Sequence, residues 1–329
     1  MRIAVDAMGG DHAPQAVVQG ALQAARLWSD LHIILVGDSS KIEAYMENQP
    51  SNVSIHHTSE TIGADDEPVK AVRRKKDSSM VVAGELVKTK QADAMISAGN
   101  TGALMATGLL VIGRIPGIIR PALAPMIPTI HGNGVIALDL GANMDATAEH
   151  LGQYAIMGSI YRSKVDGISN PRVGLLNIGA EASKGNELTK AAYVLLEQSP
   201  VHFIGNVESR DVLNPPCDVI VCDGFAGNIM LKSYEGAASI IFGAIRKEFT
   251  KNIFTKLSAF VMKPGLSRFR KKFDYTEHGA APLLGIDGIV LKCHGSSDQH
   301  AFKNAFRQAR LMFNTHLIET ISKEISQEK

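Results

Sequence analysis

Short apolar runs alternate with longer amphipathic stretches along almost the whole chain. Runs at 3–5 and 33–36 are each followed by an amphipathic stretch, at 16–27 and 42–46. Later runs at 94–96, 123–127, 135–140, 173–177 and 219–222 are apolar on both faces, which is typical of buried parallel strands. This alternation of strands and helices predicts a layered α/β/α fold.

Clusters of small polar residues follow five of these predicted strands. They occupy positions 6–11, 97–102, 139–143, 177–179 and 223–228. Open α/β sheets bind their ligands at the carboxyl ends of the strands. We therefore expect the five clusters to line one shared cleft.

The composition is that of an ordinary globular protein. The chain has 329 residues, 45% hydrophobic and 20% charged, which excludes disordered and collagen-like classes. Its length favours two lobes. No repeat or low-complexity linker separates them, so we treat residues 1–329 as a single domain of two α/β lobes around a cleft.

The cysteines and the amino terminus indicate a compartment. Cys217, Cys222 and Cys293 are an odd number without C-x-x-C spacing, so the sequence predicts neither a disulfide framework nor a zinc site but a reducing cytoplasm. The first residues lack the apolar segment of a signal peptide. Residues 94–113 carry no charge and are long enough to span a bilayer, but the turn at Gly99-Asn100 favours a strand followed by a buried helix.

One segment differs from the rest in charge. Residues 246–272 contain nine basic residues and a single acidic one, Glu248. The net charge of this segment is therefore +8, and that of the remainder of the chain is −7. Apolar residues recur there at helical spacing, and Pro264-Gly265 is expected to end the helix. The sequence thus predicts a protruding, basic, amphipathic helical excursion at 234–275. The stripe comprises Ile241, Ile245, Phe249, Ile253, Leu257 and Phe260, and the basic residues include Arg246, Lys247, Lys251, Lys256 and Lys263.

Two segments have the pattern of an anion site. Residues 99–103 follow a strand and open a helix, where free backbone N–H groups and the helix dipole attract anions, and Asn100, Thr101 and Gly102 add polar groups. A plain helix cap by Asn or Thr explains this segment equally well. Residues 224–228, with Gly227 and Asn228, repeat the pattern, and the two together favour an anionic ligand.

Familiar nucleotide and hydrolase motifs do not occur. The sequence has no Walker loop, no G-x-G-x-x-G, no G-x-S-x-G and no H-E-x-x-H. Cys222 lies in an apolar run, where a cysteine is more often inert than nucleophilic. The sequence therefore disfavours a nucleotide-binding protein, a serine hydrolase and a zinc peptidase.

Several polar residues at the strand ends are candidates for proton transfer or charge. Asp6, Asp11 and His12 could form an acid/base group, or an Asp could cap the helix that begins near Pro14. The loop at 177–186, with Asn177 and Lys184, could bind phosphate or be an ordinary solvated loop. Lys292 and His294 precede the last helices and suit an anion or proton transfer, although a lone histidine carries little weight.

Six motifs in order carry a family resemblance. They are V-D-A-M-G-G-D-H-A-P (5–14), S-A-G-N-T-G-A-L (97–104), L-D-L-G-A-N (138–143), V-G-L-L-N-I-G-A-E-A-S-K-G-N (173–186), D-G-F-A-G-N (223–228) and K-C-H-G-S-S (292–297). Together, from about residue 2 to 320, they resemble the bacterial phosphate acyltransferase (PlsX) family of phospholipid synthesis. Ile178, Ala180 and Ser209 depart from residues common in that family.

The resemblance implies a function and partners. It implies transfer of a long acyl chain from acyl carrier protein to inorganic phosphate, producing acyl phosphate for a membrane glycerol-3-phosphate acyltransferase. It also implies a fold like that of isocitrate and isopropylmalate dehydrogenases and phosphotransacetylases, a homodimer, and peripheral attachment to the inner face of the cytoplasmic membrane. The +8 segment suits an acidic carrier protein and an anionic bilayer.

The expected mechanism is direct attack of bound phosphate on the thioester, with no acyl-enzyme, cofactor or metal. We assign the phosphate and oxyanion cradle to residues at the strand ends, and charge or proton transfer to a second set. The cradle set is Asn100, Thr101, Gly102, Asn143, Asn177, Gly227, Asn228 and Lys292, and the catalytic set is Asp6, Asp11, His12, Lys184 and His294.

Three alternatives remain. An oxidoreductase of the isopropylmalate dehydrogenase architecture would need a metal-binding aspartate cluster and a nicotinamide site that the sequence does not reveal. A basic scaffold or nucleic-acid binder is disfavoured by a net charge of +1 and few aromatic residues in the basic segment. The apolar stripe at 241–260 could also serve only as a dimer interface.

Overall fold

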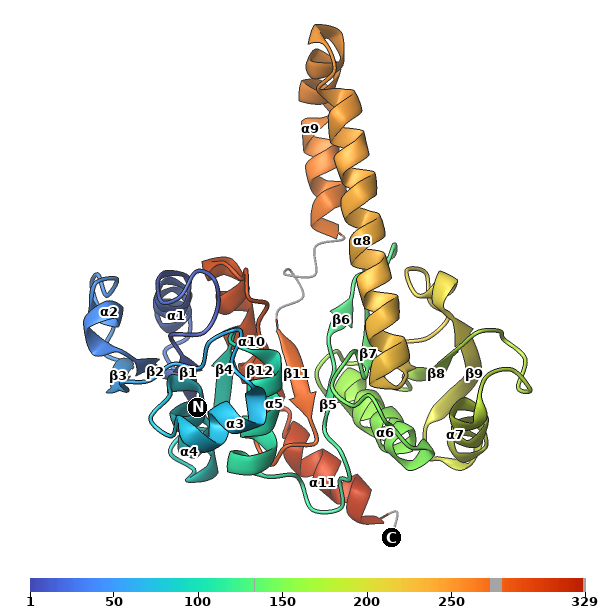
Figure 1. Cartoon of the computed structure of the whole chain (residues 1–329), viewed down its shortest axis with the longest axis horizontal. Coiled ribbons are helices and arrows are strands. Elements are labelled where there is room, and N and C mark those ends of the chain that lie inside the picture. The colour runs from blue at the N-terminus through green and yellow to red at the C-terminus, as the bar shows by residue number, and fades with distance from the viewer. Residues whose placement is uncertain (133, 273–279, 328–329) are drawn as a thin grey trace.

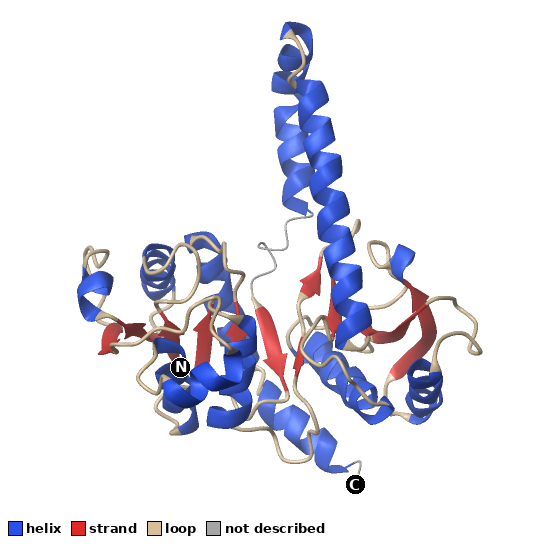
Figure 2. Ribbon diagram, in the orientation of Figure 1, coloured by secondary structure: helices blue, strands red, loops and turns tan. Residues whose placement is uncertain are grey.

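The computed structural model describes residues 1–132, 134–272 and 280–327, without side-chain detail at 257 and 266–272. Two sheets lie side by side, each with its own helices, and a helical hairpin projects from between them (Figure 1, Figure 2). The predicted layered α/β fold with a protruding helical segment is confirmed.

The first lobe is built on a seven-stranded sheet of order β3-β2-β1-β4-β12-β11-β5. Neighbours from β3 to β12 are parallel, whereas β11 is antiparallel to both of its neighbours. The strands are β1 (Arg2–Asp6), β2 (His32–Gly37), β3 (Val53–His57), β4 (Ala94–Ser97), β5 (Ala122–Leu123), β11 (Ala281–Leu284) and β12 (Ile289–Lys292).

Helices cover both faces of this sheet. Ile3 and Val5 pack into the cluster that contains α1 and α10, whereas Ala4 packs into the cluster that contains α3, α4 and α5. Both faces are therefore apolar, as the runs in the sequence predicted. The helices are α1 (Gln15–Leu27), α2 (Ser39–Glu43), α3 (Pro68–Arg74), α4 (Ser79–Lys88), α5 (Thr101–Thr107), the π-helical turn η1 (Gly108–Ile112) and α10 (Gln299–Asn314).

The second lobe is built on a five-stranded sheet of order β6-β7-β10-β8-β9. All pairs are parallel except β6 with β7. Its elements are β6 (Met126–Ile127), β7 (Val135–Leu138), α6 (Ala148–Lys164), β8 (Arg172–Asn177), α7 (Glu187–Gln198), β9 (His202–Glu208), the turn η2 (Ser209–Asp211) and β10 (Val219–Val221), and α11 (Leu317–Gln327) returns to pack against α6.

The predicted single strand at 123–127 is wrong. The chain crosses here from one sheet to the other, with β5 antiparallel to β11 and β6 antiparallel to β7. Pro125 stands between the two short strands and has no N–H to donate to a ladder, so a continuous strand is interrupted. The expected helix at 42–46 is also displaced, because Asp38 caps α2 four residues earlier through Ser40 N.

The basic segment forms two helices rather than one. α8 (Gly224–Phe249) and α9 (Ile253–Lys272) run side by side as a hairpin (Figure 1). Asn252 Oδ1 accepts a hydrogen bond from Thr255 N, and Asn252 N donates to Thr255 Oγ1, at 3.0 and 3.1 Å, so this pair starts the second helix. Pro264 lies inside α9 instead of ending the helix, so the expected end at Pro264-Gly265 is wrong. Residues 273–275 of the predicted excursion lie outside the described residues.

One apolar cluster joins the two lobes. It contains Ile3 and Leu291 of the first sheet, Leu138 and Val219 of the second, and Tyr154 of α6. The lobes are therefore packed on a common core, which holds the ends of both sheets in fixed places.

Candidate functional site

The carboxylate of Asp6 lies buried at the end of β1. It accepts hydrogen bonds of 2.6 Å from both Ser79 Oγ and Ser97 Oγ, and one of 3.2 Å from Met8 N. Burial raises the pKa of Asp6, and these hydrogen bonds oppose the rise. The group is thus a desolvated carboxyl held by two hydroxyls from neighbouring elements.

Three turns of the first lobe meet around Asp6. Gly9 follows β1, and a Cβ there would lie 2.7 Å from Gly99 N, in the turn after β4. Asp11 N donates to Gly295 O, after β12, at 2.8 Å. Three strand ends therefore lie together beside Asp6, and Gly99 N donates to Ser97 Oγ at 3.0 Å within this group of turns.

Lys292 ends β12 beside these turns. Its Nζ lies 3.5 Å from Ala98 O and also donates to Cys293 O. Burial lowers the pKa of this ammonium, while the nearby carboxyls of Asp6 and Asp11 favour its charge. No carboxylate oxygen lies within 4 Å of Lys292 Nζ among the residues that the structure describes, so this half-buried cation has neighbouring carbonyls but no ion-pair partner.

The other proton-transfer candidates of this lobe are exposed. Asp11, His12 and His294 all reach solvent. The Nδ1 atom of His294 lies 2.7 Å from Ser296 Oγ. Asp11 does not cap α1, whose cap position is Pro14 and has no side-chain hydrogen bond.

Asn100 caps α5. Its Oδ1 accepts from Ala103 N at 3.0 Å, and its Nδ2 donates to Ala64 O at 2.9 Å. The side chain therefore fixes the start of the helix and the 64–66 loop. Thr101 is exposed, and a Cβ at Gly102 would meet Pro68. Because the Asn100 amide is already hydrogen-bonded, a ligand at this turn would bind backbone groups instead.

A second buried carboxylate, Asp139, organises the end of β7. It accepts from Ala142 N at 3.0 Å, Asn143 N at 2.6 Å and Asn143 Nδ2 at 2.9 Å. Burial raises its pKa against these hydrogen bonds. Asn143 also donates to Pro121 O, so its amide is a positioning group in this structure.

The start of α8 packs directly on this turn. Gly224 N donates to Asn143 O at 3.0 Å, and Asn228 lies against Gly141, whose φ is +121°. A Cβ at Gly227 would overlap the carbonyl oxygen of Asp139. The glycines thus allow a helix amino terminus to approach the 139–143 turn closely.

The thiol of Cys222 is hydrogen-bonded to the same turn. This thiol is buried and donates to Asp139 O at 3.1 Å, and burial raises its pKa well above the usual value. A nucleophilic cysteine needs a stabilised thiolate. The structure therefore agrees with the view of Cys222 as inert.

The 177–186 loop is anchored at its base. Asn177 Nδ2 donates to Lys184 O at 3.2 Å and to Asn206 Oδ1 at 3.0 Å, and Asn206 Nδ2 donates to Glu181 O at 2.9 Å. The side chain of Lys184 is exposed. The asparagine pair holds the loop across β8 and β9, and the exposed Lys184 side chain is accessible to a charged partner.

The predicted residues therefore fall into two groups, one on each sheet. Asp6, Asn100 and Lys292 belong to the first lobe, whereas Asn143 and Asn228 belong to the second. A single cleft shared by both groups stays a prediction. The sequence did not single out Ser79 or Asn206, and it placed Asp139 in the 139–143 cluster without a role of its own. Asp139 lies inside a quoted motif, but Ser79 and Asn206 give no local signal, because their partners are distant in sequence.

The basic residues of the hairpin are exposed. This holds for Arg246, Lys247, Lys251, Lys256 and Lys263. Phe260 is 73% exposed on the same hairpin, and the side chain of Leu257 lies outside the described residues. None of the described helices is both long and apolar enough to cross a bilayer. In the described part of the chain, no three His, Cys, Asp or Glu side chains gather as a metal site would require.

Comparison with known proteins decides the family. The fatty acid synthesis protein family matches residues 1–320. A phosphate acyltransferase from Geobacillus thermodenitrificans (strain NG80-2) is 54% identical over 325 residues, covering 99% of both chains. The chain belongs to the phosphate acyltransferase family. A second family member, from Bacillus cytotoxicus, is 53% identical and covers 100% of this chain and 99% of its own. The predicted family and enzyme class, an acyltransferase of lipid synthesis, are thereby confirmed.

Solved structures confirm the fold. A phosphotransacetylase from Streptococcus pyogenes superposes with a TM-score of 0.61 at 18% identity, covering 97% of this chain and 94% of its own. A 4-hydroxythreonine-4-phosphate dehydrogenase from Klebsiella pneumoniae gives 0.50 at 12% identity, with coverage of 96% and 98%. The dehydrogenase likeness extends to architecture alone, whereas the acyltransferase relatives match in sequence over their full length, which disfavours the oxidoreductase alternative.

Proposed function

We propose that this acyltransferase moves a long acyl chain from acyl carrier protein to inorganic phosphate. The product, an acyl phosphate, would serve a membrane glycerol-3-phosphate acyltransferase. The family membership supports acyl transfer to phosphate, and the whole chain, 1–329, acts as one domain of two lobes in this proposal.

The observation that carries the phosphate site is the half-buried ammonium of Lys292. It lies at the meeting point of three strand ends and has carbonyl neighbours but no carboxylate within 4 Å in the described part of the chain. A desolvated cation without an ion-pair partner is costly, and a bound phosphate dianion removes that cost. The backbone N–H groups of the adjoining turns can add neutral donors.

The reaction needs one bond made and one broken. A phosphate oxygen attacks the thioester carbonyl carbon, the new C–O bond forms, and the C–S bond breaks as the carrier thiolate leaves and takes up a proton. Backbone N–H groups at Thr101 and Gly102 in the first lobe, with the side chain of Asn228 in the second, would stabilise the carbonyl oxygen. Gly227 N already donates to Asp223 O at 3.0 Å, so Gly227 serves close packing rather than the oxyanion. His294 and Asp11 are exposed enough to exchange the proton with solvent. The buried, hydrogen-bonded Cys222 supports direct displacement without an acyl-enzyme.

Lys292→Met tests the phosphate site. The measurement is phosphate-dependent release of the carrier thiol from hexadecanoyl acyl carrier protein, with acyl phosphate trapped by hydroxylamine. Loss of a buried charged hydrogen-bond donor should raise the KM for phosphate about 10- to 100-fold. Lys88→Met is the matched control, because Lys88 Nζ also donates to a carbonyl, Ile112 O, at 2.9 Å in the same lobe. An unchanged KM in Lys292→Met refutes the site, and absence of product from the parent protein refutes the function.

We also propose that the hairpin forms a homodimer and contacts acidic surfaces. Large apolar side chains are exposed on both of its helices, including Ile240 at 75% on α8 and Phe254 at 79% on α9. Burying them against a second copy would stabilise the pair. The +8 charge of residues 246–272 supports an electrostatic landing site for acyl carrier protein or for an anionic bilayer.

Charge reversal tests this role. Lys256→Glu with Lys263→Glu should weaken vesicle binding and raise the KM for the carrier protein. Both effects should shrink as the salt concentration rises. Lys190→Glu with Lys232→Glu is the control away from the basic segment. Binding that ignores both charge and salt would contradict the proposal. Light scattering of the same proteins measures the dimer, and a monomer at micromolar concentration would overturn that part.

We place the enzyme in the cytoplasm, at the inner face of the membrane. All three cysteines are free in the structure, which suits a reducing compartment. Comparing vesicle binding with duplex DNA binding at one salt concentration separates a bilayer partner from nucleic acid, for which we expect no specific binding.

A further inference from the structure

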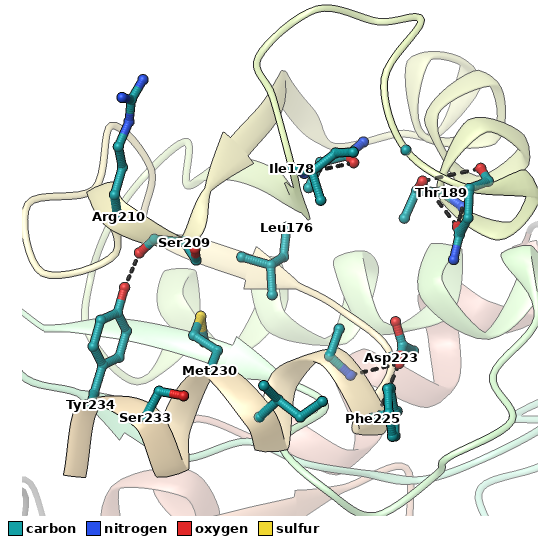
Figure 3. Close-up of a pocket in the computed structure, with 15 residues that line it drawn as sticks. Leu176, Ile178, Thr189, Ser209, Arg210, Asp223, Phe225, Met230, Ser233 and Tyr234 are labelled. Atoms are coloured by element: carbon teal, nitrogen blue, oxygen red, sulfur yellow. Dashed lines mark hydrogen bonds between the residues drawn. The ribbon is translucent and has the colours of Figure 1, made fainter. Parts of the chain in front are cut away.

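A cavity of about 740 Å³ lies in the second lobe, and Lys292 does not line it. It runs between the first turns of α8 and the ends of β8 and β9 (Figure 3). Cavities of this size hold ligands of a few tens of atoms. Neither the fold nor the chemistry at Lys292 requires it.

The middle of the cavity is apolar. Leu176 and Met230 are buried and form its floor, between the two ends (Figure 3). Ile178, Phe225 and Ile229 border it, and they remain 80%, 62% and 53% exposed. Such large apolar side chains around one hollow leave a surface that gains free energy when hydrocarbon covers it.

The two charged residues that line the cavity, Arg210 and Asp223, already make hydrogen bonds within the chain. Asp223 Oδ1 accepts from Phe225 N and Ala226 N at 3.0 and 2.9 Å. Arg210 donates to Glu208 Oε1 at 2.8 Å. A ligand segment without charge or hydrogen-bonding groups therefore fits the space between them better than a peptide or a nucleotide does.

The two ends of the cavity differ. At one end, Asp223 and Phe225 begin α8, where Gly224 N donates to Asn143 O and so joins the 139–143 turn. At the other end lie Tyr234 and Arg210 (Figure 3). From Phe225 to Tyr234 the helix rises about 14 Å, which suits an extended hydrocarbon chain.

We propose that this cavity, the acyl groove, holds the hydrocarbon chain of the acyl donor. The thioester end lies at the start of α8, near Gly227 and Asn228, and the tail extends towards Tyr234. The inference rests on the proposed function, since it assigns the chain of the same substrate. Each methylene that enters the groove should improve affinity about fourfold until the groove is full.

A substitution that fills the groove tests the proposal. Ser233 lines the groove near its Tyr234 end and is exposed, so Ser233→Phe can shorten the space without disturbing the core. Ser239→Phe is the matched control, because Ser239 is exposed on the same helix and does not line the groove. Ile229→Ser is a second variant that lowers apolarity without adding bulk.

Two readouts separate this inference from the function itself. Fluorescence titration with cis-parinaric acid measures hydrocarbon binding without turnover, and kcat/KM is measured for carrier thioesters from butanoyl to hexadecanoyl. We expect Ser233→Phe and Ile229→Ser to weaken parinarate at least tenfold, and Ser233→Phe to lose the preference for long chains while short-chain turnover persists.

Other outcomes overturn the groove assignment. Equal parinarate affinity and equal chain-length profiles in all variants do so. A shift of Ser233→Phe from dimer to monomer in light scattering, with an unchanged chain-length profile, would instead identify the groove as an interface between two copies. If the parent protein forms no acyl phosphate, the function fails, while parinarate binding still decides whether the groove accepts hydrocarbon.

Discussion

Ser97 Oγ donates a 2.6 Å hydrogen bond to Asp6 Oδ2, and so ties the ends of two adjacent strands, β4 and β1, through one buried carboxylate. Ser79, at the start of α4, donates to the other oxygen, Oδ1, at the same distance. Two neutral hydroxyls thus compensate a charge that no cation of residues 1–132, 134–272 or 280–327 contacts. This arrangement positions the turns that surround Lys292.

Ser97→Ala should lower the free energy of unfolding by about 1–3 kcal/mol, because it leaves a buried carboxylate underbonded. Burial has already raised the folded-state pKa of Asp6, and loss of a donor raises it further. A raised folded pKa destabilises the protein only where Asp6 is ionised. The difference between variant and parent should therefore be largest near neutral pH and shrink as pH falls through the folded pKa of Asp6.

Urea denaturation at a series of pH values measures this effect. Ser54→Ala, on the edge strand β3, is the control and should change stability little, since Ser54 contacts no carboxylate in the described part of the chain. A loss in Ser97→Ala that is the same at every pH would show that the hydroxyl does not act through the charge of Asp6.

Gly227→Ala should destabilise the protein by about 1–3 kcal/mol and reduce acyl phosphate formation. The new Cβ would overlap Asp139 O and approach Cys222 Sγ to 2.8 Å, and the backbone at the start of α8 would have to shift. Gly236→Ala in the same helix is the matched control. A Cβ there meets nothing within 4 Å, so stability should rise by about 0.5–1 kcal/mol. Thermal unfolding of both variants checks the contrast, and equal effects would refute it.

The cysteines should resist alkylation in the folded enzyme. Burial raises the pKa of Cys217 and Cys293 to about 12 and that of Cys222 well above its usual value. At pH 8 almost no thiolate is present, and all three thiols are buried. Iodoacetamide followed by mass spectrometry should label them only after unfolding.

Cys222→Ala should retain acyl phosphate formation within about threefold of the parent, because direct displacement assigns no bond to that sulfur. Cys217→Ala serves as a control for the loss of a buried thiol in the same lobe. A hundredfold loss confined to Cys222→Ala, with a normal melting curve, would indicate an acyl-enzyme.

Asn252→Ala should weaken the turn of the hairpin by about 1 kcal/mol, since it removes the cap of α9. Hydrogen exchange at residues 253–258 should become faster, while the sheets are unaffected. Ser258→Ala is the control, because Ser258 Oγ donates within its own helix, to Phe254 O, at 3.1 Å. Unchanged exchange in Asn252→Ala would mean that packing alone fixes the turn.

Local patterns were sufficient for much of the fold. Strands such as β1 and β10 are buried on both faces, so their composition identifies them without knowledge of their neighbours. The turn between α8 and α9 was missed although its Asn252 and Thr255 are local, because the apolar stripe continues in register across it. The crossing at 122–127 was missed because the run at 123–127 is apolar throughout. Pro125 was its one local signal, and pairing with two different sheets depends on segments distant in the chain.

The sequence by itself determined the family, the layered architecture and the polar strand ends, because each depends on residues close together in the chain. Only the tertiary structure decided which polar groups meet. It paired Asp6 with Ser79 and Ser97, Asn177 with Asn206, and the start of α8 with the 139–143 turn. Burial and distance, not residue type, separate a positioning asparagine from a ligand-binding one, and both arise only when distant segments pack together.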